Sequence, residues 1–592
     1  MQMLRTILEP LLEEVLQSNG IKSQHWKSML VRSREHDQGD LSLPCFPFAK
    51  ELGKSPIEIA EQLAKALPKH SALGEVNAVA GYLNIKANPH WLASQVMGQG
   101  VRIGDAYGKS PANDQHILIE HTSANPNGPF HVGRARNAIL GDTLVRLHRL
   151  HGNNVRAEYY VDDMGKQVGV LAWALANLSK EDVEQTLEQK DSVNPKWQGK
   201  ADHERVRWYQ AAQSIRQERA DKEDIEAEIG RMVHASEHGD ETVLQSFQDA
   251  YQPVLDGMLM TLQRLGIEFD TFTKESMFVT NGDVAKLMKQ FKTFEIHGVA
   301  DNGAEFLDLG ARGLKGKTEF FFRRGDGSSL YATRDIAYHM WKWNQCDQLI
   351  NVLGEDHKLQ AKQVGMTLTE LGQKTPEVLF YSFIKLPEGK MSTRKGNVVY
   401  MDDLLEEAQA QAAAVVRELH PDYPDEQVAS ISEAAGTSAV RFNIIKVSPD
   451  KGFTFRWEEA LAFEGGSAPF VMYSHARACS IAKKCEKAGV DLQANLASQV
   501  SIPEQMPKGM VELLRTLCVH SDVLAKAVND RRPHLFANQV LQLATSFNSF
   551  YRDCMILKDG ELNVFNLQLS EIARNLMRTS MEGLGIVPIE QM

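Results

Sequence analysis

Residues 116–161 hold the pattern that most restricts the fold. A short apolar run, HILIEH, is typical of a buried strand, and the proline- and glycine-rich loop SANPNGPFHVGR follows it. Apolar residues then recur at helical spacing up to Gly152, where a helix would end, and VRAEYYV indicates a second strand. Strand, helix and strand in this order predict a βαβ unit in a parallel sheet, with a ligand site at the carboxyl ends of the strands.

The length of the chain requires several domains, because a single hydrophobic core stops growing near roughly 250 to 300 residues. The sequence of 592 residues begins with an α+β pattern and ends in helices. Between about residues 166 and 270 the sequence is helical and acidic, which predicts an insertion in an α/β sheet domain. The function of this insertion does not follow from the sequence. The predicted units are an N-terminal α+β domain, a sheet domain, a helical connector and a C-terminal helix bundle, at 1–112, 113–400, 401–462 and 463–592.

Composition excludes several classes of protein. No apolar run approaches the roughly 20 residues of a membrane helix, and the start lacks the pattern of a signal peptide. We therefore expect a cytoplasmic protein that contacts no membrane. Six scattered cysteines without a CxxC pair indicate reduced thiols and no structural metal site. A net charge of −12 argues against indiscriminate nucleic-acid binding, which depends on phosphate neutralisation, but it allows a local basic face.

The loop before the predicted helix is a candidate phosphate site. Backbone N–H groups and the helix dipole at a helix start attract anions, and His131 is the one residue at this turn that both donates hydrogen bonds and carries charge. Gly133 would let a base or ribose pack on the backbone. The loop lacks the glycine patterns of dinucleotide folds and P-loops, so on its own a plain turn into a helix explains it better.

A second loop strengthens the nucleotide interpretation. LPEGKMSTRKGN, residues 386–397, follows the last predicted sheet strand and places Lys390, Arg394 and Lys395 among small residues, as a polyphosphate clamp would. Alone, it would be an ordinary surface loop. Together, HVGR and this loop resemble the HIGH and KMSKS motifs of class I aminoacyl-tRNA synthetases, which implies a Rossmann-like domain that activates an amino acid with ATP.

Two carboxylates and a phenol suggest which amino acid. Glu120 ends the first strand, and Asp335 lies four residues after Tyr331, so the latter two share a face of a helix that begins there. Two carboxylates and a phenol in one pocket suit the fork of N–H donors on a guanidinium. Each acid taken singly is better explained as a helix cap or a surface ion pair.

Longer stretches carry a more specific resemblance. IEHTSANPNGPFHVGRARNAILGDTL, EYYVDDMGKQ, DGSSLYATRDIAYH, INVLGEDHKLQAKQ, KLPEGKMSTRKGNVVYMDDLL and NDRRPHLFANQVLQLATSFNSFYRDC resemble arginyl-tRNA synthetases, particularly the archaeal-type branch. The resemblance spans nearly the whole chain. It implies a class I Rossmann-like catalytic domain with an insertion, an N-terminal domain that contacts the tRNA elbow and a C-terminal anticodon-binding domain.

The resemblance also implies residue roles. Glu120, Tyr331 and Asp335 would hold the guanidinium, and Ser123 and Asn125 the α-amino and carboxylate end. His357 takes a position where relatives often have glutamine, so its contact with arginine is open. His131 and Gly133 would contact ATP. The HIGH-like motif comprises Ala124, Asn125, Pro126, Asn127, Gly128, Pro129, Phe130, His131, Val132, Gly133 and Arg134.

This sequence departs from the family pattern at two places. Arg134 stands where the motif has its final histidine. The clamp, formed by Lys390, Met391 and Ser392, reads KMSTRK, which leaves Arg394 and Lys395 as rival candidates for its second cation.

The C-terminal region alternates cations with aromatic residues, which suits the stacking and edge contacts that read single-stranded anticodon bases. Many of these aromatics would instead form the core of the bundle. The expected substrates are L-arginine, ATP with Mg²⁺, and tRNA(Arg), bound by a monomer. The candidate tRNA contacts are Arg477, Arg531, Arg532, His534, Phe547, Phe550 and Tyr551.

Two other functions fit parts of the pattern. A nucleotidylyltransferase could use the same two loops, although such enzymes rarely need large flanking domains. A catalytically silent tRNA-binding paralogue is the other alternative, and the presence of His131, Gly133, Lys390, Glu120 and Asp335 argues against it.

Overall fold

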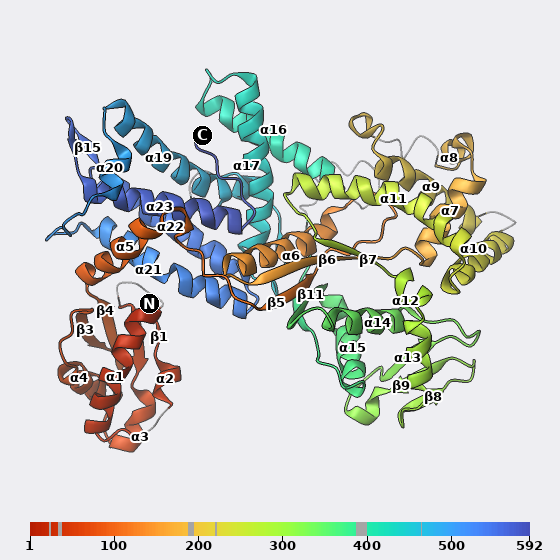
Figure 1. Ribbon diagram of the computed structural model, residues 1–592, viewed down its shortest axis with the longest axis horizontal. Helices are drawn as coiled ribbons and strands as arrows, with labels where there is room; N and C mark the ends of the chain where they lie inside the picture. Colours follow the sequence, from red (N-terminus) through yellow and green to blue (C-terminus); the bar gives the residue numbers. More distant parts are fainter. Residues whose placement is uncertain (23–24, 34–37, 188–193, 219–221, 386–398, 463–464) are drawn as a thin grey trace.

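The computed structural model describes residues 1–592 except 23–24, 34–37, 188–193, 219–221, 386–398 and 463–464. In Figure 1 the catalytic sheet lies at the centre, the N-terminal domain extends to the lower left, and the acidic insertion lies to the right. The C-terminal helices pack above the N-terminal domain. The predicted fold class is confirmed, because a parallel-sheet domain joins an N-terminal α+β domain and a C-terminal all-α domain.

Five parallel strands form the catalytic sheet, in the order β12–β11–β5–β6–β7. β5 pairs with β11 on one side and with β6 on the other, so the direction of winding reverses beside β5. Such a reversal opens a ligand crevice at the carboxyl ends of the strands. The strands are β5 (His116–Glu120), β6 (Asn154–Val161), β7 (Thr271–Lys274), β11 (Gln348–Gly354) and β12 (Glu377–Tyr381).

Helix α6 (Val132–Leu150) completes the predicted βαβ unit and is buried along most of its length. One buried ion pair ties it to the C-terminal half of the chain. Arg441, in α17 (Asp425–Ile445), has no exposed side-chain surface and donates to the Asp142 carboxylate of α6 at 2.5 Å. The same guanidinium donates to the carbonyl of Leu584, so it fixes three segments at once.

The insertion is helical and has a small hydrophobic core of its own. The three strands between residues 297 and 323 do not join the parallel sheet. They form a separate antiparallel sheet that packs with the following helices. The insertion comprises α7 (Lys166–Asn177), α8 (Lys180–Leu187), α9 (Ala201–Glu218), α10 (Lys222–Glu237) and α11 (Glu241–Arg264). After β7 come α12 (Ser276–Thr280), α13 (Asp283–Phe291), β8 (His297–Val299), β9 (Glu305–Asp308), β10 (Glu319–Arg323), α14 (Tyr331–Trp343) and α15 (Lys358–Glu370).

The N-terminal domain shares one hydrophobic core with the C-terminal bundle. A Cβ atom at Gly100 would lie 2.5 Å from Cδ1 of Ile572, so glycine permits the close approach of the two domains. In the described part of the chain, no helix is long and apolar enough to cross a bilayer. The N-terminal elements include α1 (Gln2–Ser18), β1 (Val31–Arg32), β2 (Leu41–Pro44), α4 (Pro56–Ala66), β3 (Leu73–Val79), β4 (Tyr82–Ala87) and α5 (Pro89–Ile103). The C-terminal helices include α16 (Met401–Leu419), α17, α19 (Ala468–Lys487), α21 (Lys508–Asn529), α22 (Pro533–Asp553) and α23 (Val564–Gly583).

Candidate active site

His131 is the N-cap of α6, at the carboxyl edge of the sheet. The segment after the second predicted loop returns to this point. The Val132 N–H donates to the carbonyl of Val399 at 2.9 Å, and His131 forms an antiparallel bridge with Tyr400. Tyr400 is in turn the N-cap of α16. The candidate phosphate loop and the start of α16 are therefore joined through their backbones.

The His131 imidazole lies over the first turn of α6. A Cβ atom at Gly133 would come within 3.0 Å of its Nδ1, so the glycine makes room for this ring. Burial, assisted by the charge of Arg134, lowers the pKa of His131 to about 4. The side chain expected to bring charge to the site is thus a neutral hydrogen-bond donor near pH 7.

The residue that departs from the HIGH pattern supports the loop itself. Nη1 of Arg134 donates to the carbonyl of Asn125 at 3.4 Å, and burial lowers the pKa of its guanidinium. The Nδ2 groups of Asn125 and Asn127 each lie 2.9 Å from Oε1 of Gln167, in the first turn of α7. The loop is therefore held by the insertion as well as by its own residues.

The loop begins with two non-glycine residues in left-handed backbone conformations. Thr122 has φ 69° and Ser123 has φ 39°, and such residues cost on the order of 1–3 kcal/mol each. The Thr122 N–H donates to Oδ1 of Asn137 at 2.7 Å. The Tyr159 hydroxyl accepts from the N–H of Ala124 and donates to its carbonyl. These bonds hold a strained turn directly after β5.

Glu120 lies at the end of β5, as the sequence predicts. Its Oε1 accepts a hydrogen bond from Ser123 Oγ at 3.1 Å, and its Oε2 lies 2.6 Å from Nζ of Lys342. Lys342, near the end of α14, has no exposed side-chain surface. The carboxylate is therefore oriented from two sides and paired with a buried cation.

Asp335 belongs to the same polar network. Its Oδ1 lies 3.0 Å from Nδ1 of His339, whose Nε2 lies 2.7 Å from the amide nitrogen of Asn351 and 3.4 Å from Nζ of Lys342. Burial alone would raise the pKa of Asp335, but the contact with His339 and the charge of Lys342 hold the pKa below its ordinary value. The network thus joins Asp335 to Glu120 and keeps Asp335 ionised.

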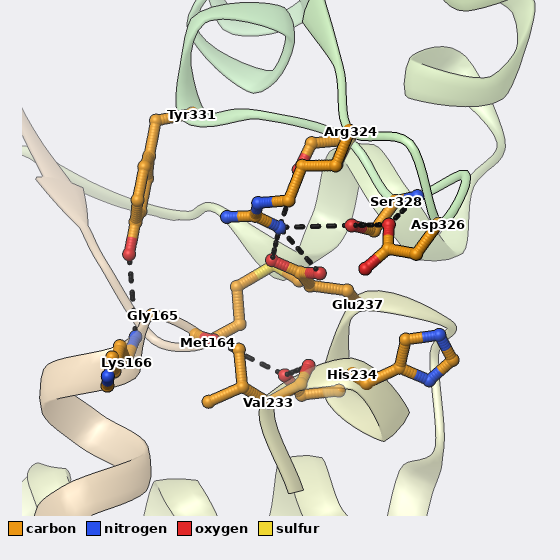
Figure 2. Close-up of polar contacts among 12 residues, drawn as sticks. Met164, Gly165, Lys166, Val233, His234, Glu237, Arg324, Asp326, Ser328 and Tyr331 are labelled. Carbon is orange, nitrogen blue, oxygen red and sulfur yellow. Dashed lines mark hydrogen bonds and ion pairs between the residues drawn. The ribbon is translucent and has the colours of Figure 1, made fainter. Parts of the chain in front are cut away.

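Tyr331 begins α14 and is 46% exposed. Figure 2 shows its phenol directed at the start of α7, where the Lys166 N–H donates to the hydroxyl at 3.4 Å. The Arg334 guanidinium packs on its ring at 4.5 Å. In the same view, Arg324 pairs with Glu237 at the end of α10 at 3.1 Å. A hydrogen bond from the insertion therefore holds the Tyr331 phenol.

His357 lies in the turn between β11 and α15 and is exposed. Its Nδ1 lies 3.2 Å from Gln360, and its charge contributes to the lowered pKa of Asp335. It therefore lies near Asp335, without a bond to that residue among the described contacts. The clamp residues Lys390, Met391, Ser392, Arg394 and Lys395 lie outside the described residues.

Sequence reasoning missed Lys342, His339 and Gln167. Lys342 and His339 follow Asp335 at seven and four residues, so helical spacing alone could have placed them on the face of α14 that carries Asp335. A buried lysine was not expected, because lysine rarely loses all contact with water unless it is paired. Nothing in the local pattern marks Gln167.

Some of the candidate tRNA contacts lie on the surface of the C-terminal bundle, and others are buried in it. Arg477 packs between two aromatic rings, 4.8 Å from that of Tyr473 and 5.2 Å from that of Tyr551, and both tyrosines are 38% exposed. These three side chains line a surface cavity of about 440 Å³ together with Lys484 and Met592. An arginine between two exposed tyrosines offers π-faces and positive charge to unstacked bases.

Two other candidates are corrected. Phe547 and Phe550 have no exposed surface and belong to the hydrophobic core of the bundle, so neither side chain can contact RNA in this structure. Arg531 pairs with Glu377 of β12 and so holds the bundle to the catalytic sheet. Arg532 is exposed, whereas His534 is partly buried and its pKa is lowered by burial.

Comparisons with known proteins agree with this arrangement. Residues 97–457 match the family model "tRNA synthetases class I (R), catalytic domain", which covers more than half of the chain. The chain belongs to the arginyl-tRNA synthetase family. The family's N-terminal domain model, "Arginyl tRNA synthetase N terminal domain", matches residues 3–87, and "DALR anticodon binding domain" matches residues 471–592.

Full-length relatives support the same family. An arginine–tRNA ligase of Methanocella arvoryzae is 39% identical over 96% of both chains, and that of Methanocaldococcus jannaschii is 38% identical over 93% of both. These matches confirm the expected resemblance to archaeal members of the family. The structure of Thermus thermophilus arginyl-tRNA synthetase superposes with a TM-score of 0.77 at 25% identity and covers 99% of this chain and all of that one. A Plasmodium falciparum arginyl-tRNA synthetase shares the fold, with a TM-score of 0.75 at 15% identity over 99% of both chains.

Proposed function

We propose that this chain is an arginine–tRNA ligase, which activates L-arginine with ATP and transfers it to the 3′ end of tRNA(Arg). The observation that carries the proposal is the convergence of Glu120 and Asp335 on one polar network at the carboxyl edge of the parallel sheet. His131 stands at the start of α6 beside the same edge. A pocket with two carboxylates and a helix start suits a guanidinium beside a nucleotide phosphate.

In the first step, an oxygen of the arginine carboxylate would attack the α-phosphorus of ATP, which enters as its magnesium complex. The bond to the pyrophosphate oxygen breaks, and arginyl-adenylate forms. In the second step, a terminal ribose hydroxyl of tRNA attacks the arginyl carbonyl carbon, and AMP leaves. Neither step requires a protein nucleophile, so positioning and charge stabilisation do most of the work.

The described residues suggest how the work is divided. His131, neutral near pH 7, would donate a hydrogen bond to a phosphate oxygen, while the N–H groups at the start of α6 face the same charge. Positive charge on the triphosphate would come from Lys390 and from Arg394 or Lys395, together with Mg²⁺. Ser123 already bonds Glu120, so it is placed to orient both the pocket and the α-amino end of the substrate.

Discrimination against lysine would follow from geometry. A guanidinium presents a planar fork of donors that two carboxylates and a phenol can accept together, whereas an ammonium is a point charge. For the tRNA, we propose that Tyr473, Arg477 and Tyr551 contact anticodon bases. We propose that the protein acts as a monomer in the cytoplasm.

The test is arginine-dependent exchange of pyrophosphate into ATP, measured with and without tRNA(Arg), followed by charging of that tRNA. Arginine should support both reactions, and lysine and citrulline should support neither. Exchange with another small carboxylate would favour the nucleotidylyltransferase alternative. Silence with every amino acid, although tRNA still binds, would favour the non-catalytic paralogue.

A further inference from the structure

A buried polar cluster joins the insertion to the start of α16. Lys200, Asp202 and His203 lie at the start of α9 in the insertion, and Asp402 lies in the first turn of α16. The side chains of Asp202 and Asp402 have no exposed surface, and that of His203 is 5% exposed. The cluster lies outside the arginine pocket, and none of its members has a role in the chemistry proposed above.

Asp402 is the centre of the cluster. Its Oδ2 accepts from Nζ of Lys200 at 2.6 Å and from Nε2 of His203 at 2.9 Å, and Oγ1 of Thr261 in α11 lies 3.0 Å away. Although burial opposes ionisation, the bonds from His203 and Lys200 lower the pKa of Asp402, so it carries a negative charge. Two insertion helices thus hold one carboxylate at the start of α16.

Asp202, His203 and Asp402 are residue types that bind divalent cations. One ligand atom from each lies within 4.8 Å of the others, which is close enough to share an ion. The ammonium of Lys200, however, lies 3.0 Å from Asp202 and 2.6 Å from Asp402. It already supplies the positive charge that a metal would bring. The cluster is therefore an internal ion network and not a metal site.

The cluster reaches His131 by two routes. The ring of His203 packs edge-on against that of Tyr400 at 5.3 Å, and Tyr400 forms the backbone bridge with His131. Three residues further along α9, Val206 packs on the other part of the loop, where a Cβ atom at Gly128 would lie 2.5 Å from its Cγ2. The first turns of α9 therefore contact both the loop that carries His131 and the segment paired with it.

We propose that the His203–Asp402 contact, supported by Lys200, positions His131 for reaction at the ATP phosphate, and that this is a function of the acidic insertion. His203 and Asp402 are positioning residues, because they act on the reaction through Tyr400 and His131. The inference rests on the proposed function. It assigns the insertion a part in the adenylate step and none in arginine selection.

The experiment compares His203→Leu with His203→Gln in the full-length protein. Both variants remove the imidazole, but the Gln amide nitrogen can replace Nε2 as donor to Asp402. Arginine-dependent pyrophosphate exchange is measured with tRNA(Arg) present, as kcat and as KM for ATP and for arginine. Wild type and Glu406→Gln are measured alongside. Glu406 is a matched control, because it pairs with Lys196 and Arg264 one turn further along α16.

We expect His203→Leu to lower kcat at least tenfold with KM for arginine within twofold of wild type, and His203→Gln to recover most of the loss. Glu406→Gln should stay within twofold of wild type. Equal kcat in His203→Leu and wild type, or equal losses in the Leu and Gln variants, would overturn the inference while the proposed function stands. An inactive wild type would instead refute the function. If His203→Leu does not fold, Asp402→Asn decides by the same kcat and KM criteria.

Discussion

The loop that carries His131 and the face of α14 that carries Asp335 lie at the same edge of the sheet but are built differently. The loop is positioned by backbone and side-chain hydrogen bonds to distant segments, and its key side chain is partly buried and uncharged near pH 7. The α14 face is positioned by side-chain ion pairs, His339 with Asp335 and Lys342 with Glu120 of β5, and the Asp335 carboxylate stays charged. A neutral donor suits a site where negative charge accumulates during reaction, whereas fixed charges suit a site that must select a cation before reaction begins.

The largest loss of activity is expected from a substitution in the loop, and it tests the contrast between the two regions. His131→Ala should lower kcat for adenylate formation by about 10²- to 10³-fold, the usual result of losing one preorganised donor. KM for arginine should change by less than about threefold, because the pocket is untouched. Steady-state exchange kinetics separate the two parameters. A large rise in KM for arginine with kcat preserved would erase the distinction between the regions.

Asp335→Asn should give the opposite result, a large rise in KM for arginine with a smaller change in kcat. The variant keeps the shape of the side chain but removes its charge, and hydrogen bonds to charged groups contribute about 1.5–3 kcal/mol, or roughly 10- to 150-fold. We expect that factor in KM for arginine and a smaller effect on kcat. Titration of exchange rate against arginine concentration measures it. An unchanged arginine requirement would remove Asp335 from the pocket.

The C-terminal bundle extends the comparison to aromatic residues. Tyr551→Ala should raise KM for tRNA by roughly 5- to 30-fold, the lower part of what stacking on one base contributes, and leave thermal stability nearly unchanged. Phe547→Ala should instead destabilise the fold by about 3–5 kcal/mol, because it empties a core position. Charging kinetics and thermal unfolding of both variants test this pair. If the two substitutions had similar effects on charging kinetics and on thermal stability, the division between surface and core would be wrong.

The smallest expected effect concerns pH. Burial lowers the pKa of His131 and of His520 to about 4, from an ordinary value near 6.5. The unfolded chain then binds more protons than the folded chain between these values, so stability should fall as pH drops from about 6.5 to 4. His520→Gln should reduce the loss between pH 7.5 and 5.5 by about 1 kcal/mol, measured by urea unfolding. His131 does not titrate above pH 6, so its contribution to kcat should be constant from pH 6 to 8.

The sequence predicted the parts of the site that depend on local pattern. The βαβ unit and the shared face of Tyr331 and Asp335 follow from periodicity, because residues three or four apart meet on a helix. The same spacing would have reached Lys342. The bridge between His131 and Tyr400 joins residues 269 positions apart, since 400 − 131 = 269, and no local signal specifies such a pairing.

The aromatic residues of α22 show a different limit of the sequence. Phe547 and Tyr551 are four residues apart on one helix, yet the first is fully buried and the second is exposed. An amphipathic pattern gives the buried stripe only approximately, and residues at its border can fall on either side. The packing of α22 against its neighbours decides which rings remain available to RNA.

The bridge between His131 and Tyr400 also restricts how sequences of this family can be recombined. A chimaera that receives a foreign insertion would carry new side chains against Tyr400 and Gly128 while keeping the old backbone pairing. Segments 128–134, 200–206 and 399–402 therefore form one unit of exchange, although 264 residues lie between the first and the last. Grafts that transfer all three together should retain catalysis more often than grafts that divide them.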